Sequence, residues 1–170
     1  ANLERGGAEC IVLCTNTMHK LSGAIEANTT IPMLHIADAT AERICAENLS
    51  TIGLLGTRFT MEEDFYSGRL SRKYGLKVLI PDQKEREEIH KVIYEELCMG
   101  VVLDESRAFY RTAIEHLVRN GAQGIILGCT EIGMLVKEED SPVPLYDTTR
   151  IHAEAAADWA LNEMEIFFDE

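Results

Sequence analysis

The 170-residue sequence lacks several features that would fix its class directly. Its uninterrupted apolar stretches, such as residues 11–13 and 125–127, are far shorter than the about 20 residues that cross a bilayer, so we expect a soluble protein. Basic residues are scarce, because 16 Lys and Arg stand against 29 Asp and Glu. The formal charge of −13 opposes nucleic-acid phosphates and anionic lipids alike, so binding to nucleic acid or to a membrane surface is not expected.

Cysteine and glycine patterns with a fixed meaning are also missing. The five cysteines are odd in number and show no Cys-x-x-Cys spacing, which argues against a disulfide framework or a zinc knuckle and predicts free thiols. The sequence indicates no metal site and no phosphate-binding glycine loop. The first ten residues show no export signal, which leaves the cytoplasm as the expected location.

Short β-branched runs alternate with amphipathic segments along the chain. Strands are predicted at residues 10–14, 31–36, 51–56, 77–80, 124–128 and 143–146. Helices are predicted at residues 18–27, 39–48, 61–74, 83–99, 106–119 and 150–167. This alternation predicts an α/β fold in which helices flank mainly parallel sheets, and it places functional residues at the carboxyl ends of the strands.

One sequence unit occurs twice. Residues 7–16 align without a gap over residues 121–130, and in both copies a helix stop leads into a buried strand that ends in small polar residues. The repeat predicts two pseudo-symmetric lobes, the first of them incomplete at its N-terminus. We expect residues 1–49, completed by residues 147–170, to form the first lobe and residues 50–146 to form the second. A cleft between the matching strand ends would present one reactive group to each face of a small substrate.

The alignment also predicts which side chains face each other across that cleft. It sets Thr15, rather than Cys14, opposite Cys129. Adjacent strand residues point to opposite faces, so a shift by one residue exchanges the side chain that enters the cleft. A local bulge would bring in Cys14 instead, and that alternative stays open.

Five segments, taken in order, resemble the aspartate/glutamate racemase family, close to its enterobacterial broad-specificity or L-specific branch: residues 14–19, 54–60, 93–97, 128–131 and 146–148. The resemblance implies an isomerase that racemises aspartate or glutamate without pyridoxal phosphate or another cofactor, and that forms a homodimer. It also implies one catalytic cysteine in each lobe. Anchored on Asn16, the family's Cys-Asn-Thr-x-His pattern has Thr15 where the first cysteine belongs.

Racemisation at Cα needs a base on one face of the substrate and an acid on the other. We expect Cys129 to remove the proton, because a thiol with an ordinary pKa of about 8.5 can be tuned into range. A helix expected to begin at Thr130 would favour the thiolate. Thr15 would return a proton only as a weak acid or through water. By analogy with the family, this pairing predicts catalysis that starts mainly from the L enantiomer.

Hydroxyl and amide groups near the strand ends are the predicted substrate contacts. Asn16, Thr17 and Thr130 are expected to neutralise charge that develops on the substrate carboxylate. The resemblance implies a further contact by Thr60. Glu131 is expected either to start a helix or to bind the substrate ammonium, since a carboxylate beside the thiol would raise its pKa unless it points away.

The other cysteines and histidines are expected to be structural. Cys10, Cys45 and Cys98 fall on apolar stripes and are predicted to be small core residues. His19 follows the first strand end and is expected to orient a neighbour. The remaining four histidines are expected on helix or strand surfaces.

Two further interpretations of these residues stay open. The first is a related cysteine-dependent enzyme, either a maleate isomerase or a hydantoin racemase, whose substrate lacks the free ammonium. The second is a non-catalytic binding or assembly module, which the replaced first cysteine and the incomplete first lobe favour. Loss of the Cα proton in heavy water would separate an enzyme from a module.

Overall fold

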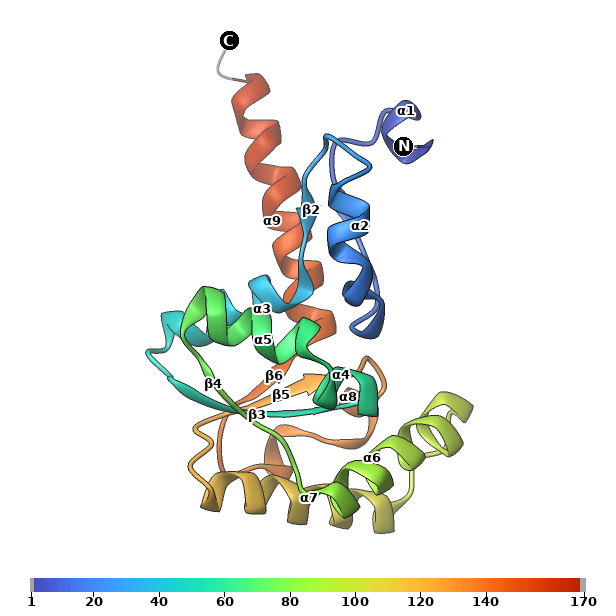
Figure 1. The fold of residues 1–170 in the computed structure, drawn as a ribbon, viewed down its shortest axis with the longest axis vertical. Helices are drawn as coiled ribbons and strands as arrows, with labels where there is room; N and C mark the ends of the chain where they lie inside the picture. Colours follow the sequence, from blue (N-terminus) through green and yellow to red (C-terminus); the bar gives the residue numbers. More distant parts are fainter. Residues whose placement is uncertain (1, 169–170) are drawn as a thin grey trace.

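The computed structural model describes residues 2–168 (Figure 1). Within that range, four parallel strands form the larger sheet in the order β4–β3–β5–β6. They are β3 (Thr51–Gly56), β4 (Lys77–Leu79), β5 (Ile125–Gly128) and β6 (Leu145–Asp147). A smaller parallel sheet pairs β1 (Ile11–Val12) with β2 (Met33–Leu34). The predicted α/β fold with parallel sheets and flanking helices is confirmed, and each predicted strand has its counterpart.

Nine α-helices and three 3-10 turns connect these strands within the described range. The α-helices are α1 (Asn2–Arg5), α2 (Ser22–Glu26), α3 (Ile36–Ala46), α4 (Arg58–Glu62), α5 (Asp64–Tyr74), α6 (Gln83–Glu95), α7 (Asp104–Arg119), α8 (Ile132–Leu135) and α9 (Thr148–Phe168). The 3-10 turns are η1 (Thr17–Leu21), η2 (Leu97–Met99) and η3 (Glu138–Asp140). In the part of the chain that the structure describes, no helix has the length and apolar character needed to traverse a membrane.

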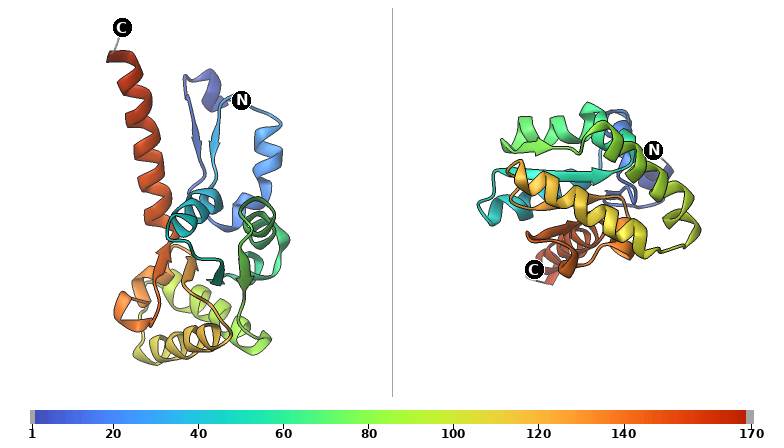
Figure 2. Two further views of the ribbon diagram at one scale, coloured as in Figure 1. Left: turned by 90° about the vertical axis from the view of Figure 1, so that its left-hand side faces the viewer. Right: turned by 90° about the horizontal axis from the view of Figure 1, so that it is seen from below.

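The larger sheet separates two apolar layers. Ile52 and Leu54 of β3 face α3 and α5, whereas Leu55 of the same strand faces α6 and α7. Figures 1 and 2 show these helix pairs on opposite faces of the sheet. Because successive strand residues alternate between faces, one short apolar strand supplies both layers. Each fully buried Leu or Ile contributes roughly 1.5–3 kcal/mol to folding, so the two layers on this sheet supply much of the folding free energy.

Two glycines bring the ends of β3 and β5 into close contact. Gly56 pairs with Gly128 in the parallel ladder. A Cβ atom added to Gly128 would lie 2.8 Å from the carbonyl oxygen of Leu55, which is closer than such atoms approach. Side chains at these positions would push the strands apart. Because glycine has none, the two strand ends approach closely, and the loops that follow them start side by side.

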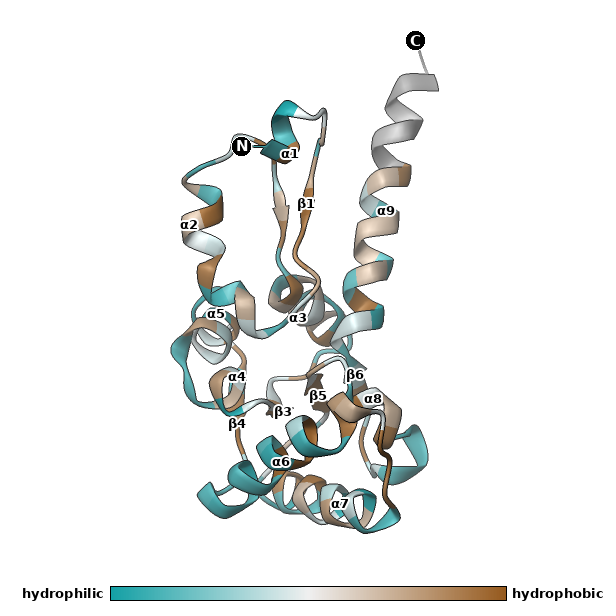
Figure 3. Ribbon diagram, turned by 90° about the vertical axis from the view of Figure 1, so that its right-hand side faces the viewer, coloured by the Kyte–Doolittle hydropathy of each residue, from teal (hydrophilic) through white to brown (hydrophobic). Residues whose placement is uncertain are grey.

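The smaller sheet, α2 and most of α9 extend away from the larger sheet, as Figure 2 shows. Apolar residues line β1 in Figure 3, although Val12 keeps 38% exposure. Helix α3 joins the two regions: Ala41 and Ile44 are buried in the core of the larger sheet, while Arg43 forms an ion pair with Glu154 of α9 at 3.0 Å. The division of the chain into lobes at residues 50 and 147 stays a prediction.

Candidate active site

A cavity of about 400 Å³ lies where the chain leaves β1, β3 and β5. Three segments that follow strands line it, together with α6 and η2. The lining residues are Cys14, Thr15, Asn16, Thr17 and Met18 after β1; Thr57 after β3; Gly128, Cys129, Thr130 and Glu131 at the end of β5; and Ile93, Tyr94 and Cys98 of α6 and η2. The two strand ends that align in the repeat thus share one cavity. Five of the six predicted site residues line it, and Thr60 lies directly behind Thr57.

Cys129 sits half-buried at the end of β5, with its thiol turned to a carboxylate. Its Sγ donates a hydrogen bond to Oε2 of Glu131 at 3.0 Å, and the hydroxyl of Thr130 donates to the same oxygen at 2.5 Å. Burial, and then the nearby carboxylate, raise the pKa of Cys129 to about 12. The resting thiol is therefore protonated near neutral pH, and the thiolate forms only when another group takes its proton.

The expectation that a helix beginning at Thr130 supports the thiolate is wrong. Helix α8 begins at Ile132 and has four residues, so it contributes no extended helix dipole at the sulfur. Glu131 occupies the N-cap position but makes no side-chain capping bond. Burial opposes its ionisation, yet the hydrogen bonds from Cys129 and Thr130 hold the pKa of Glu131 below its ordinary value. An ionised acceptor therefore faces the thiol.

Thr15 and Cys14 both line the cavity from the side of β1. Thr15 is half-buried, whereas Cys14 is exposed and its Sγ lies 3.8 Å from the carbonyl oxygen of Val12. The choice between them as the group opposite Cys129 stays a prediction. The structure does bring residues 15 and 129 to the same cavity, as the repeat requires.

Asn16 lines this cavity, and its side chain has a buried acceptor without a partner among the described residues. Its Nδ2 donates to Oγ1 of Thr148 at 3.0 Å, and that hydroxyl donates in turn to the carbonyl oxygen of Leu127 at 2.8 Å. Since the hydroxyl proton of Thr148 is already used, Asn16 can only donate to it, which fixes the orientation of the amide. Its Oδ1 is then left buried without a hydrogen-bond partner among the described residues. Such an atom favours a ligand that brings a donor.

Three threonine hydroxyls form a cluster beside this amide. Oγ1 of Thr17 lies 3.1 Å from that of Thr57 and 3.3 Å from that of Thr60, and the last two are 3.2 Å apart. Thr57 also caps α4 by accepting from the backbone N–H of Thr60. Thr17 and Thr57 line the cavity, so hydroxyl groups of this cluster can donate hydrogen bonds to a carboxylate bound there.

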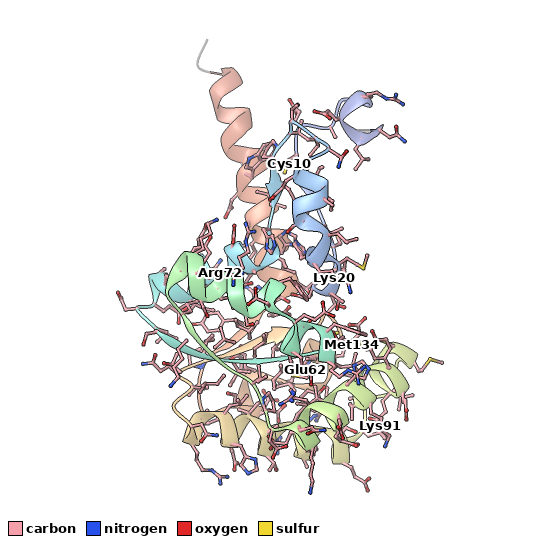
Figure 4. All side chains as sticks on the ribbon, in the orientation of Figure 1. Cys10, Lys20, Glu62, Arg72, Lys91 and Met134 are labelled. Carbon is pink, nitrogen blue, oxygen red and sulfur yellow. The ribbon has the colours of Figure 1, made fainter. Side chains whose placement is uncertain are left out.

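The predictions for the other cysteines and histidines need correction. Cys45 and Cys98 are exposed rather than buried, and Cys98 lines the cavity because α6 stops at Glu95 and a 3-10 turn rotates the chain outward. Cys10 is half-buried and directly precedes β1 (Figure 4). His35 and His152, expected at the surface, are buried beside His19, with ring centroids 4.4 and 5.8 Å from its own. The described residues contain no group of three or more His, Cys, Asp or Glu arranged to hold a metal ion.

The profile of the Asp/Glu/hydantoin racemases matches residues 1–156. This match extends over most of the 170 residues. The chain belongs to the Asp/Glu/hydantoin racemase family. It is therefore a member of a family of isomerases, and the resemblance inferred from the five sequence segments is confirmed.

Individual relatives agree with the family assignment. A crystal structure from Yersinia pestis, described as a candidate Asp/Glu racemase, is 55% identical with a TM-score of 0.91, covering 94% of this chain and 70% of that one. An aspartate racemase homologue from Pyrococcus horikoshii is 35% identical with a TM-score of 0.84 and the same coverage. The broad specificity amino-acid racemase RacX of Bacillus subtilis is 25% identical over 155 residues, which span 86% of this chain and 63% of RacX.

Proposed function

We propose that this protein racemises aspartate or glutamate without a cofactor, by removing the Cα proton on one face and returning a proton on the other. Cys129 acts on the first face and Thr15 on the second. The observation that carries the proposal is that residues 15 and 129, which the repeat aligns, line one cavity of about 400 Å³. Such a cavity suits a small amino acid held between two groups.

The first step needs a thiolate. Glu131 orients the thiol by accepting its hydrogen bond at 3.0 Å. The proton leaves Sγ for solvent when the substrate's α-ammonium group enters the cavity, because a nearby positive charge favours the thiolate. The thiolate then removes the Cα proton and becomes a thiol again, while the substrate becomes a carbanion. Donors near the substrate carboxylate stabilise the charge that develops there. We assign this role to the hydroxyl of Thr17, which Thr60 contacts from behind, and to the backbone N–H of Thr130.

The return step accounts for a preference between enantiomers. A proton delivered from the side of Thr15 inverts the carbon. It comes from a water that the hydroxyl holds, and the hydroxide left behind combines with the proton that Sγ released to solvent. A threonine hydroxyl is far too weak an acid to yield an alkoxide base near neutral pH. Proton removal therefore starts on the side of Cys129, and by family analogy this side accepts the L enantiomer.

The unpartnered acceptor of Asn16 is an argument that the substrate is an amino acid. Its unpartnered Oδ1 accepts a hydrogen bond from the α-ammonium group, which removes the cost of leaving this buried oxygen unpaired. Maleate carries no donor for this atom, whereas hydantoin does, and the family description includes hydantoin racemases. Thermal shifts with aspartate, glutamate, maleate and hydantoin therefore rank these substrate classes.

The test is Cα proton exchange in heavy water, followed by NMR from each pure enantiomer of aspartate. We expect faster initial exchange and inversion from the L form. Thr15→Cys supplies a second tunable base, and we expect it to raise the rate from the D form by about 10²-fold. Equal rates from both enantiomers in the parent protein would contradict the role of Thr15. No Cα proton exchange from either enantiomer would favour the non-catalytic module.

The homodimer implied by the family remains a prediction. Light scattering coupled to size-exclusion chromatography measures the mass of the particle directly. A mass of one chain at assay concentration would contradict it.

A further inference from the structure

His19 is almost completely buried, at 1% exposure, and both of its ring nitrogens have backbone partners. Nδ1 lies 2.7 Å from the carbonyl oxygen of Thr15, and Nε2 lies 3.1 Å from the backbone nitrogen of Ile36. A carbonyl can only accept and an N–H can only donate. The ring is therefore neutral, with its proton on Nδ1 and its lone pair on Nε2.

The surroundings of His19 favour this neutral form. Its ring lies against two other buried imidazoles, those of His35 and His152. His35 accepts from the backbone N–H of Ala37, and His152 donates to the carbonyl oxygen of Leu34. Burial lowers the pKa of His19. A protonated ring would have no lone pair to accept from Ile36, so the bridge requires the neutral state.

The two partners of His19 differ in how firmly they are held. Ile36 begins α3 and is buried in the core of the larger sheet at 2% exposure. Thr15 comes three residues after β1 ends at Val12, beyond the reach of the strand ladder. The imidazole thus connects a fixed point to a backbone carbonyl at the edge of the cavity.

We propose that His19 is a positioning residue for proton transfer: its imidazole holds the backbone of residue 15 against the N-terminus of α3, at the distance from Cys129 that the reaction needs. This inference rests on the proposed function. His19 itself does not line the cavity that holds Cys129, so it acts through Thr15.

A pair of near-isosteric substitutions separates the two bonds of the ring. In His19→Asn the amide nitrogen takes the place of Nδ1, which keeps the bond to Thr15 and gives up the acceptor for Ile36. In His19→Gln the amide oxygen takes the place of Nε2, which keeps the acceptor for Ile36 and gives up the bond to Thr15. We expect kcat for L-aspartate to fall by about 10–100-fold in His19→Gln, with KM little changed, and to stay near the parent value in His19→Asn.

His152→Gln is the matched control. It disturbs the same buried cluster, but the bond of His152 goes to Leu34 and not to residues 14–17. We expect a lower melting temperature and an unchanged kcat. If His19→Asn and His19→Gln lose kcat equally, or if His152→Gln loses as much as His19→Gln, the cluster merely supports the fold and the proposal is overturned.

NMR decides the proposal even if the parent protein shows no Cα exchange, which would overturn the proposed function alone. The ¹⁵N shifts of the His19 ring should report a proton on Nδ1. The ¹³C shift of the Thr15 carbonyl should be shared by the parent and His19→Asn and should move in His19→Gln. A ring protonated on Nε2, or a carbonyl shift that is the same in all three proteins, overturns the positioning role.

Discussion

The strand ends after β1 and β5 have the same sequence layout but very different support. β5 runs between β3 and β6, and all four of its residues are buried. β1 has two residues, pairs with β2, and leaves Val12 38% exposed. The backbone ladder of the larger sheet thus carries the chain directly to Cys129. The ladder of the smaller sheet ends before Thr15.

Side chains hold the β1 end where backbone pairing does not. Asn16 donates to Thr148, Thr17 shares a hydroxyl contact with Thr57, and His19 holds the carbonyl of Thr15. Each such bond contributes only about 0.5–1.5 kcal/mol. The position of Cys129 is therefore set by the core, whereas the position of Thr15 depends on a few polar contacts that single substitutions can remove.

The two ends also differ in charge. One residue past the repeat, the same offset sets Thr17 against Glu131, so an uncharged hydroxyl stands at one end where a carboxylate stands at the other. The carboxylate accepts a hydrogen bond from Cys129, while Thr17 faces other hydroxyls. The repeat therefore provides matching backbones with unequal chemistry at the two strand ends.

Cys129→Ala should have the largest effect on this comparison. It removes the base at the well-supported end, and we expect Cα exchange from L-aspartate to fall by about 10²–10⁴-fold. Cys98→Ala is the matched control, because Cys98 lines the same cavity from η2 and has no assigned role. Exchange measured by NMR checks both. Equal losses in the two variants would remove Cys129 from the mechanism.

Gly128→Ala should break the support of the β5 end. The added methyl group would lie 2.8 Å from the carbonyl oxygen of Leu55 and 3.2 Å from Cγ2 of Thr60, so the strands must separate. We expect a loss of about 1–3 kcal/mol in the free energy of unfolding, measured by urea titration. Cys14→Ala changes the aligned position at the β1 end, where the side chain is exposed, and should have almost no effect. A stable Gly128→Ala protein would show that the two ends are equally adaptable.

Much of the larger sheet is predictable because its signal is local. The strand predicted at residues 51–56 matches β3 completely, since Thr51–Gly56 is a continuous apolar run between turns. Residues 31–36 are predicted as a strand, yet only Met33 and Leu34 pair, and Ile36 already begins α3. His35 causes this early start, because its Nδ1 caps the helix by accepting from Ala37. A histidine cap has no common sequence signature.

The site is predictable only as far as the repeat reaches. Aligning the two units brings Thr15 and Cys129 to one cavity without any knowledge of distances. The sequence does not indicate that Tyr94 and Cys98 line the cavity. It also places His35 and His152 at the surface, although both are buried. Their positions depend on where α6 ends and on how α9 crosses α3, and both are set by tertiary packing that periodicity does not encode.

Glu131→Gln should sharpen the comparison with the smallest effect. Burial and the carboxylate raise the pKa of Cys129 to about 12, and the substitution removes the second cause, so the pKa should fall. Below that pKa the thiolate fraction grows with pH, and alkylation of Cys129, followed by peptide mass spectrometry, should therefore reach its midpoint at lower pH in the variant. Exposed Cys45 gives an internal reference in the same sample. Racemisation from L-aspartate should quicken slightly together with alkylation, because both reactions use the thiolate and the neutral amide opposes it less than the carboxylate does. If the midpoint stays in place, the carboxylate does not act on the thiol, and the charge difference between the two strand ends has no chemical consequence.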